Sequence, residues 1–117
     1  MEIQFTKVDD IHTLDEWLDR SHQQAVVLFK HSSTCPISSA AYREMKQLGT
    51  EVGIVVVQRA RDVSREVAAR TGVRHESPQV FIIRNGQSVW TASHWNITSD
   101  AVAAALREQQ GSMTAKG

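Results

Sequence analysis

Two short, unbroken apolar runs constrain the fold of this chain more than any other feature. Residues 25–29 read Ala-Val-Val-Leu-Phe, and residues 54–57 read Ile-Val-Val-Val. Runs of this length without alternating polar residues are typical of strands that are covered on both faces. Between them, residues 36–48 carry apolar side chains at helical spacing, begin with proline and end before Gly49. The sequence therefore predicts a parallel β-α-β unit.

The second half of the chain predicts an antiparallel hairpin followed by a helix. Residues 80–83 and 88–91 are strand-like and flank Asn85-Gly86, a strong signal for a tight hairpin turn. A last helix is expected to begin near Thr98, a good N-cap, with Asp100 in its first turn.

Two further helices complete the order of elements. Residues 11–18 carry apolar side chains at helical spacing, and another helix, marked by Val63 and Val67, should end at Gly72. The order is that of a thioredoxin-like fold, an α/β architecture. We expect a central mixed β-sheet of four to five strands with helices on both faces. The sequence leaves open whether residues 3–8 add an edge strand.

Length and composition limit the domain organisation and the classes of partner. The 117 residues fit one domain, predicted to cover residues 1–110, with a disordered, small and polar tail at residues 111–117. Lys+Arg and Asp+Glu both number 13, so the sequence shows no basic excess of the kind that nucleic-acid and membrane-surface binders have. No apolar run is long enough to span a bilayer, and no secretory signal is visible. With one cysteine the fold cannot depend on an internal disulfide, and we expect a cytoplasmic monomer.

That cysteine, Cys35, stands where the first buried strand turns into a helix that begins with Pro36. The unpaired N–H groups and the dipole at a helix N-terminus stabilise a thiolate, which is the nucleophilic form. A lone cysteine is often a small, inert core residue. Here Ser32, Ser33 and Thr34 precede it, and such a polar turn belongs at a surface, so we favour a reactive thiol.

Ser38 occupies the position where a dithiol enzyme carries its second cysteine. A Cys-x-x-Ser protein forms a mixed disulfide but needs an external thiol to resolve it. Ser38 either hydrogen-bonds the thiolate of Cys35 or is an ordinary polar residue of the first helical turn.

Two other segments are expected to approach Cys35. Pro78 is tolerated at a strand entrance in any fold, but in a thioredoxin-like fold this position holds a cis proline that faces the cysteine, and it offers the backbone of Ser77 to a bound peptide or thiol. The return strand of the hairpin should bring His94 and Trp95 to the same side. There His94 would polarise the thiol and Trp95 would form an apolar wall, unless both belong to a loop that packs on the sheet.

Several charged and metal-ligating side chains have a less specific pattern. His31, His75 and His94 are all expected near Cys35, but no pair has a strong metal-ligand spacing, so no metal site is predicted. The cations Lys30, Arg61 and Arg74 either accept a carboxylate of a thiol cofactor or are surface charges.

Three segments together resemble the monothiol bacilliredoxin family of thioredoxin-like proteins. They read His-Ser-Ser-Thr-Cys-Pro-Ile-Ser at residues 31–38, His-Glu-Ser-Pro-Gln at 75–79 and Ala-Ser-His-Trp-Asn-Ile-Thr at 92–98. The resemblance spans residues 3–109 and is specific because the three segments occur together.

The resemblance implies a glutaredoxin-like oxidoreductase that removes bacillithiol, a low-molecular-weight thiol, from protein cysteines after oxidative stress. It implies Cys35 as the nucleophile, Ser38 in place of a resolving thiol, and Pro78 in the ligand groove, with Thr34, Pro36 and Ser77 as supporting residues. His75, His94 and Trp95 would contact the thiol. Bacillithiol would be a co-substrate, with no tightly bound cofactor, and the partners would be bacillithiolated client proteins.

Two alternatives of different class remain. Monothiol glutaredoxins also carry iron–sulfur clusters as dimers, with one cysteine per subunit plus a thiol cofactor, and a metal-carrier function would follow that pattern. The second alternative is a non-catalytic thioredoxin-fold module that binds partners in the Pro78 groove.

Overall fold

The computed structural model describes residues 5–115 of the chain, and the side chains of residues 5–110. Its centre is one five-stranded mixed sheet in the order β1-β3-β2-β4-β5. The strands are β1 (Phe5–Lys7), β2 (Val26–His31), β3 (Val52–Val56), β4 (Gln79–Arg84) and β5 (Gln87–Ser93). β1, β2 and β3 run parallel, whereas β4 and β5 form an antiparallel hairpin beside β2. The predicted thioredoxin-like topology is confirmed.

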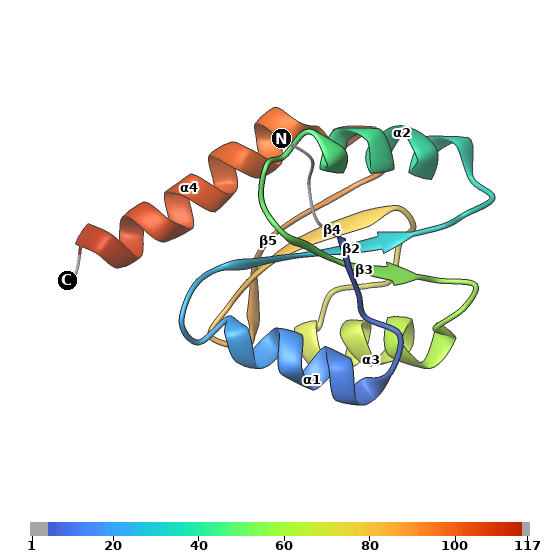
Figure 1. The fold of residues 1–117 in the computed structure, drawn as a ribbon, viewed down its shortest axis with the longest axis horizontal. Coiled ribbons are helices and arrows are strands. Elements are labelled where there is room, and N and C mark those ends of the chain that lie inside the picture. The colour runs from blue at the N-terminus through green and yellow to red at the C-terminus, as the bar shows by residue number, and fades with distance from the viewer. Residues whose placement is uncertain (1–4, 116–117) are drawn as a thin grey trace.

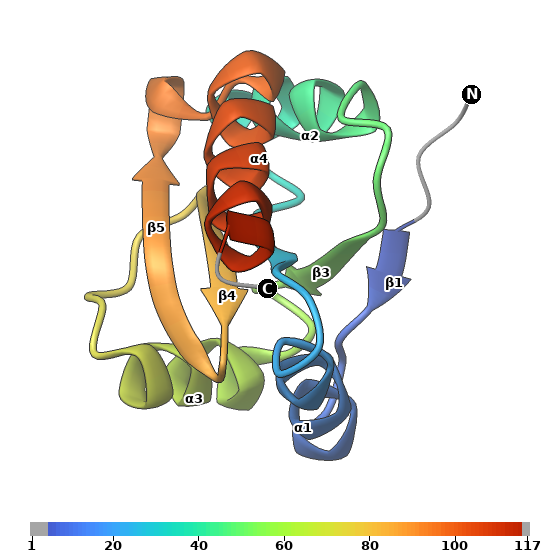
Figure 2. The ribbon, with the colours of Figure 1, turned by 90° about the vertical axis from the view of Figure 1, so that its left-hand side faces the viewer.

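Helices cover both faces of the sheet, as Figures 1 and 2 show. One face carries α1 (Ile11–Arg20) and α3 (Arg61–Thr71), and the other carries α2 (Pro36–Lys46) and α4 (Ser99–Ala115). A short 3₁₀ helix, η1 (His94–Asn96), connects β5 to α4. Within the described residues no helix combines the length and apolar character that crossing a membrane requires.

The alternation of side chains along β2 divides the core into two clusters. Val26 and Leu28 pack under α1 and α3, while Val27 and Phe29 pack under α2 and α4. All four are at most 5% exposed, and full burial of a side chain such as Leu or Phe is worth about 2 kcal/mol. The same alternation places Lys30 on the face of α1 and α3, and His31 on the face of α2.

The ends of the elements mostly follow the sequence signals. The hairpin turns at Asn85 and Gly86, with φ of 55° and 75°, and α3 is capped by Gly72 at φ 71°. Thr98 accepts the N–H of Ala101 in the first turn of α4. Each of these positions has the turn or cap residue that its backbone requires.

Three boundaries add to or differ from the expectations. An edge strand does form within the range left open, because β1 (Phe5–Lys7) pairs with β3, while residues 3 and 4 lie outside the described residues. β3 begins at Val52, two residues before the predicted apolar run, because Val52 and Gly53 also pair with β2. α4 extends to Ala115. The expected disordered tail at residues 111–117 stays a prediction, because the side chains of residues 111–115 and the whole of residues 116–117 lie outside the described part of the chain.

Candidate active site

Cys35 lies just beyond the carboxyl end of β2, at the start of α2. It is the N-cap of that helix, with extended backbone angles of −102° and 122°, and Pro36 occupies the first helical position. Its carbonyl accepts the first helical hydrogen bond, from Ser39 N–H at 3.0 Å. The side chain makes no capping hydrogen bond and is half-buried as a free thiol. Cys35 is therefore a half-buried free thiol held at a helix N-terminus.

Ser38 is fully buried, unlike an ordinary residue of a first helical turn. Its hydroxyl accepts the backbone N–H of Ser32 at 2.8 Å and lies 2.8 Å from Nδ1 of His31. Since the hydroxyl oxygen accepts from Ser32, its own proton is available for Nδ1 of a neutral His31. Among the described residues these are the partners of Ser38, so it anchors the loop that carries Cys35. A contact between Ser38 and the sulfur stays a prediction.

His31 packs as a neutral aromatic ring within the face covered by α2. Its ring lies 5.5 Å from Phe29 and 5.1 Å from Tyr42, centroid to centroid. Burial lowers the pKa of His31, and the hydrogen bond with Ser38 only partly opposes this. His31 therefore supports the loop from below and stays neutral at pH 7.

Gln58 is a site residue that the sequence interpretation missed. Its side-chain oxygen accepts the N–H of Ser33 at 3.2 Å, and its amide nitrogen donates to the hydroxyls of Ser32 and Thr34, at 2.8 and 3.2 Å. The exposed Thr34 is thus tied to the loop after β3. The parallel pairing of β2 with β3 was the available signal, because it aligns the carboxyl ends of both strands.

Pro78 enters β4 through a cis peptide bond with Ser77, as predicted. The pairing of Lys30 with Gln79 places this bond at the same end of the sheet as Cys35. The buried side chain of Gln79 fixes the preceding loop: it donates to the carbonyl of Arg74 at 3.0 Å and accepts the N–H of Glu76 at 3.3 Å. The hydroxyl of Ser77 is buried and lacks a hydrogen-bond partner among the described residues.

His94 and Trp95 follow β5 at the same end of the sheet, as the hairpin predicted. η1 packs against α2, and the two lie together at one end of the molecule in Figure 2. The N–H of His94 donates to the carbonyl of Pro78 at 3.1 Å, and its Nδ1 lies 3.4 Å from a carboxylate oxygen of Glu76. Trp95 is 69% exposed, so its indole is not a cover for the core; Ile97 fills that place.

His75 faces away from α2, towards α3. Its Nδ1 lies 3.1 Å from Nζ of Lys30 and 3.3 Å from the hydroxyl of Ser64. Burial lowers the pKa of Lys30 to about 8. Burial and, secondarily, the charge of Lys30 lower the pKa of His75, with Glu76 opposing.

The three predicted histidines thus surround the site without converging. His31 lies under α2, His75 lies against α3, and His94 follows β5. In the part of the chain that the structure describes, no three side chains of His, Cys, Asp or Glu come close enough to hold a metal ion.

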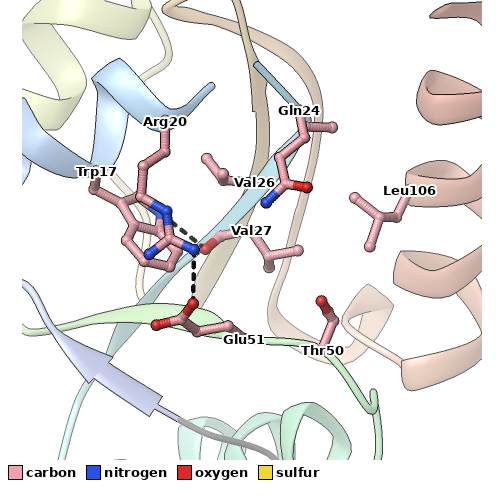
Figure 3. A pocket seen from close by; sticks show the side chains of 9 residues that line it. Trp17, Arg20, Gln24, Val26, Val27, Thr50, Glu51 and Leu106 are labelled. Carbon is pink, nitrogen blue, oxygen red and sulfur yellow. Dashed lines mark hydrogen bonds and ion pairs between the residues drawn. The ribbon is translucent and has the colours of Figure 1, made fainter. Parts of the chain in front are cut away.

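A further hollow, of about 200 Å³, lies at the opposite end of the sheet, where β2 begins (Figure 3). Its two charged side chains form an ion pair: Arg20 donates to Glu51 at 2.7 Å. The indole N–H of Trp17 donates to the carbonyl of Val27 at 3.1 Å. These contacts join α1 to the sheet and are structural.

The family model described as monothiol bacilliredoxin BrxC matches residues 6–102. The chain belongs to the monothiol bacilliredoxin family. The match covers the Cys35 loop, the cis proline and the His94 segment together.

Solved structures agree with this bacilliredoxin assignment at the level of the fold. One, assigned as an oxidoreductase with a thioredoxin fold, is 33% identical and superimposes with a TM-score of 0.80, covering 86% of this chain and 92% of that one. The thioredoxin NaTrxh of Nicotiana alata is 12% identical, with a TM-score of 0.74 over 94% of this chain and 96% of its own. A thioredoxin of Malassezia sympodialis is 14% identical, with a TM-score of 0.71 over 94% and 93%. A redox function based on a thiol is the general property that the bacilliredoxin family and the first of these structures support.

Proposed function

We propose that this bacilliredoxin removes bacillithiol, or a similar low-molecular-weight thiol, from mixed disulfides on client proteins. The Cys35 thiolate would attack the bacillithiol sulfur of the mixed disulfide. The bond between that sulfur and the client sulfur breaks, the client thiolate leaves and takes up a proton, and Cys35 retains the bacillithiol as a new disulfide. A second bacillithiol thiolate then attacks this disulfide, releases bacillithiol disulfide and restores Cys35.

The observation that carries the proposal is the presence of Ser38, and not a second cysteine, at the third position after Cys35. The chain holds one cysteine, and the position of a resolving thiol is filled by a buried serine whose hydroxyl is engaged by His31 and Ser32. A mixed disulfide on Cys35 therefore has no internal thiol to resolve it. A small external thiol fits this constraint, because it reaches a half-buried sulfur more easily than a second folded protein does.

The surroundings of Cys35 suit a co-substrate that binds and dissociates in each turnover. The cis-proline loop and η1 lie at the same end of the sheet as the sulfur, and the exposed indole of Trp95 offers an apolar surface. We extend the proposal to a role after oxidative stress in a reducing cytoplasm, where mixed disulfides with the thiol accumulate and must be reversed.

Mass spectrometry of the purified protein tests the proposal. Mild oxidation in the presence of bacillithiol should add to Cys35 the mass of one bacillithiol less two hydrogens, and a bacillithiolated client should regain its free thiol when the protein and bacillithiol are supplied. Cys35→Ser should abolish both results, while Ser33→Ala, an exposed residue of the same loop, should retain them. A wild-type protein that forms no adduct and releases no client thiol would contradict the proposal.

A further inference from the structure

Two hollows beside the active-site end of the sheet share the exposed ring of His75. One, of about 150 Å³, is lined on its α3 side by Arg61, Ser64 and Arg65. The other, of about 490 Å³, is lined by Arg74, Glu76 and His94 together with His75. The two hollows adjoin at this imidazole, and we call them together the depression.

The charges around this depression are unbalanced. Arg61, Arg65 and Arg74 are exposed, and no carboxylate among the described residues lies within ion-pair distance of any of them. The acid that lines the depression, Glu76, is already engaged by His94 at 3.4 Å and by the hydroxyl of Ser93 at 3.3 Å. Since the whole chain has no net charge, this accumulation of positive charge is local.

A buried cation lies directly beneath the depression. Lys30 has no exposed surface, its Nζ contacts His75 at 3.1 Å, and the ring of Phe81 lies 5.8 Å away. No acidic side chain of residues 5–110 pairs with it. A buried ammonium without a carboxylate is costly, and its field, weakly screened by protein, favours an anion above it.

Lys30 also fixes which nitrogen His75 presents. An ammonium donates hydrogen bonds and accepts none, so Nδ1 of His75 must accept and the neutral ring carries its proton on Nε2. The ring therefore has one remaining donor, in a depression that is also lined by the guanidinium groups of Arg61, Arg65 and Arg74. This arrangement of donors suits a carboxylate.

The depression is connected to the reacting end of the site. Arg74 and Glu76 are fixed by Gln79, next to the cis-proline bond. His94, on its rim, is bonded to the carbonyl of Pro78. On the other side, the loop from β3 to α3, which precedes Arg61, is joined through Gln58 to the Cys35 loop.

We propose that this depression binds the carboxylate end of the low-molecular-weight thiol while its sulfur reaches Cys35. The inference rests on the proposed function and adds the recognition element: a thiol that bears a carboxylate, as bacillithiol does through its malate group, is selected over a neutral one. The commitment to a small molecule follows from the compact shape, since the cations surround one imidazole and do not extend as a strip along which an acidic protein segment would lie.

Steady-state kinetics on two substrates test this inference. One client peptide is prepared as a mixed disulfide with bacillithiol and, separately, with 2-mercaptoethanol, which has no carboxylate. Arg74→Gln and Arg65→Gln should each raise KM for the bacillithiol substrate about fivefold, with kcat little changed and the neutral substrate unaffected. Arg107→Gln, an exposed arginine on α4, removes the same charge elsewhere and should change neither. Equal effects on both substrates, or no effect on either, would overturn the inference and would point to general electrostatics or to an acidic client segment.

A binding measurement separates failure of the inference from failure of the proposed function. In Cys35→Ser, S-methyl bacillithiol should shift the backbone amide resonances of residues 74–76 in an NMR titration, and Arg74→Gln should weaken this response about fivefold. If the wild type turns over neither disulfide but this binding persists, the proposed function fails and the carboxylate site stands. If turnover is seen without any such shift, the inference alone fails.

Discussion

The hydroxyl of Ser38 lies 2.8 Å from Nδ1 of His31, in the position where a dithiol enzyme of this fold has its resolving sulfur. The same hydroxyl accepts the N–H of Ser32 at 2.8 Å. The residue that makes this bacilliredoxin a monothiol protein is therefore also the residue that closes the loop around Cys35.

Ser38→Ala should destabilise the protein. The substitution leaves the N–H of Ser32 and Nδ1 of His31 without their buried partner, and an unsatisfied buried group costs about 1–3 kcal/mol. Urea unfolding should show this loss in the free energy of unfolding. The control is Ser33→Ala, because Ser33 is exposed and contributes only its backbone N–H to Gln58. Equal stability of the two variants would mean that the Ser38 contacts do not support the fold.

The stability of the protein should fall in mild acid because of His31. Burial lowers its pKa in the folded state below the ordinary value of 6.5. The unfolded chain then binds more protons than the folded one in that range, so stability is complete above pH 6.5 and decreases as the pH falls through the lowered folded pKa. His31→Phe keeps an aromatic ring against Phe29 and Tyr42 but removes the titrating group. The free energy of unfolding, measured between pH 7 and pH 5, should fall less steeply in the variant; parallel curves would exclude His31 as the cause.

Much of the site could be predicted because its signals are local. The position of Cys35 before Pro36, the hairpin at Asn85-Gly86 and the cis bond at Pro78 each depend on neighbours in the sequence or on the order of elements. Gln58 could not be predicted in this way. It is one exposed glutamine, and its function exists only because the parallel register brings it to residues 24 to 26 positions earlier in the chain.

Lys30 illustrates the same limit. The sequence left open whether this lysine accepts a carboxylate or is a surface charge, whereas in the structure its side chain is completely buried. Its burial follows from the central position of β2 between β3 and β4, under the face that α1 and α3 cover, and from the loop that brings His75 over it. Neither contact is visible in the residues adjacent to Lys30.

Gln58→Ala should slow the reactions of Cys35. The side chain makes three hydrogen bonds to the loop of residues 32–34, and their loss should let that loop open and misplace the sulfur, with a turnover several-fold lower. Hydrogen exchange at residues 32–34 should become faster in parallel. Arg59→Ala is the matched control, since Arg59 is the exposed next residue. Faster exchange with unchanged turnover would mean that the loop does not need to be fixed for the reaction.

Gly53→Ala should strongly destabilise the sheet. A Cβ atom at this position would lie 2.6 Å from Cε2 of Trp17, and Trp17 is 2% exposed and bonded to the carbonyl of Val27. Overpacking of this kind costs about 1–3 kcal/mol. Combining Gly53→Ala with Trp17→Phe makes room for the methyl group, so thermal or urea unfolding should reveal a double mutant less destabilised than the sum of the single variants. Simple additivity would argue against the close contact.

Lys30→Met should stabilise the protein at pH 7, by about 1 kcal/mol or more, because a flexible apolar side chain replaces a buried ammonium that has no carboxylate partner. The effect should depend on pH in a defined direction. The folded pKa of Lys30 is about 8, below the ordinary 10.5, so between these values the folded wild type loses its proton while the unfolded chain keeps it. The wild type therefore gains stability as the pH rises from 8 to 10.5, and its deficit relative to Lys30→Met should narrow. Urea unfolding at pH 7, 9 and 10.5 measures this narrowing. A constant difference would mean that Lys30 is not desolvated as its burial indicates, and a less stable variant at pH 7 would mean that its contact with His75 outweighs the cost of burying the charge.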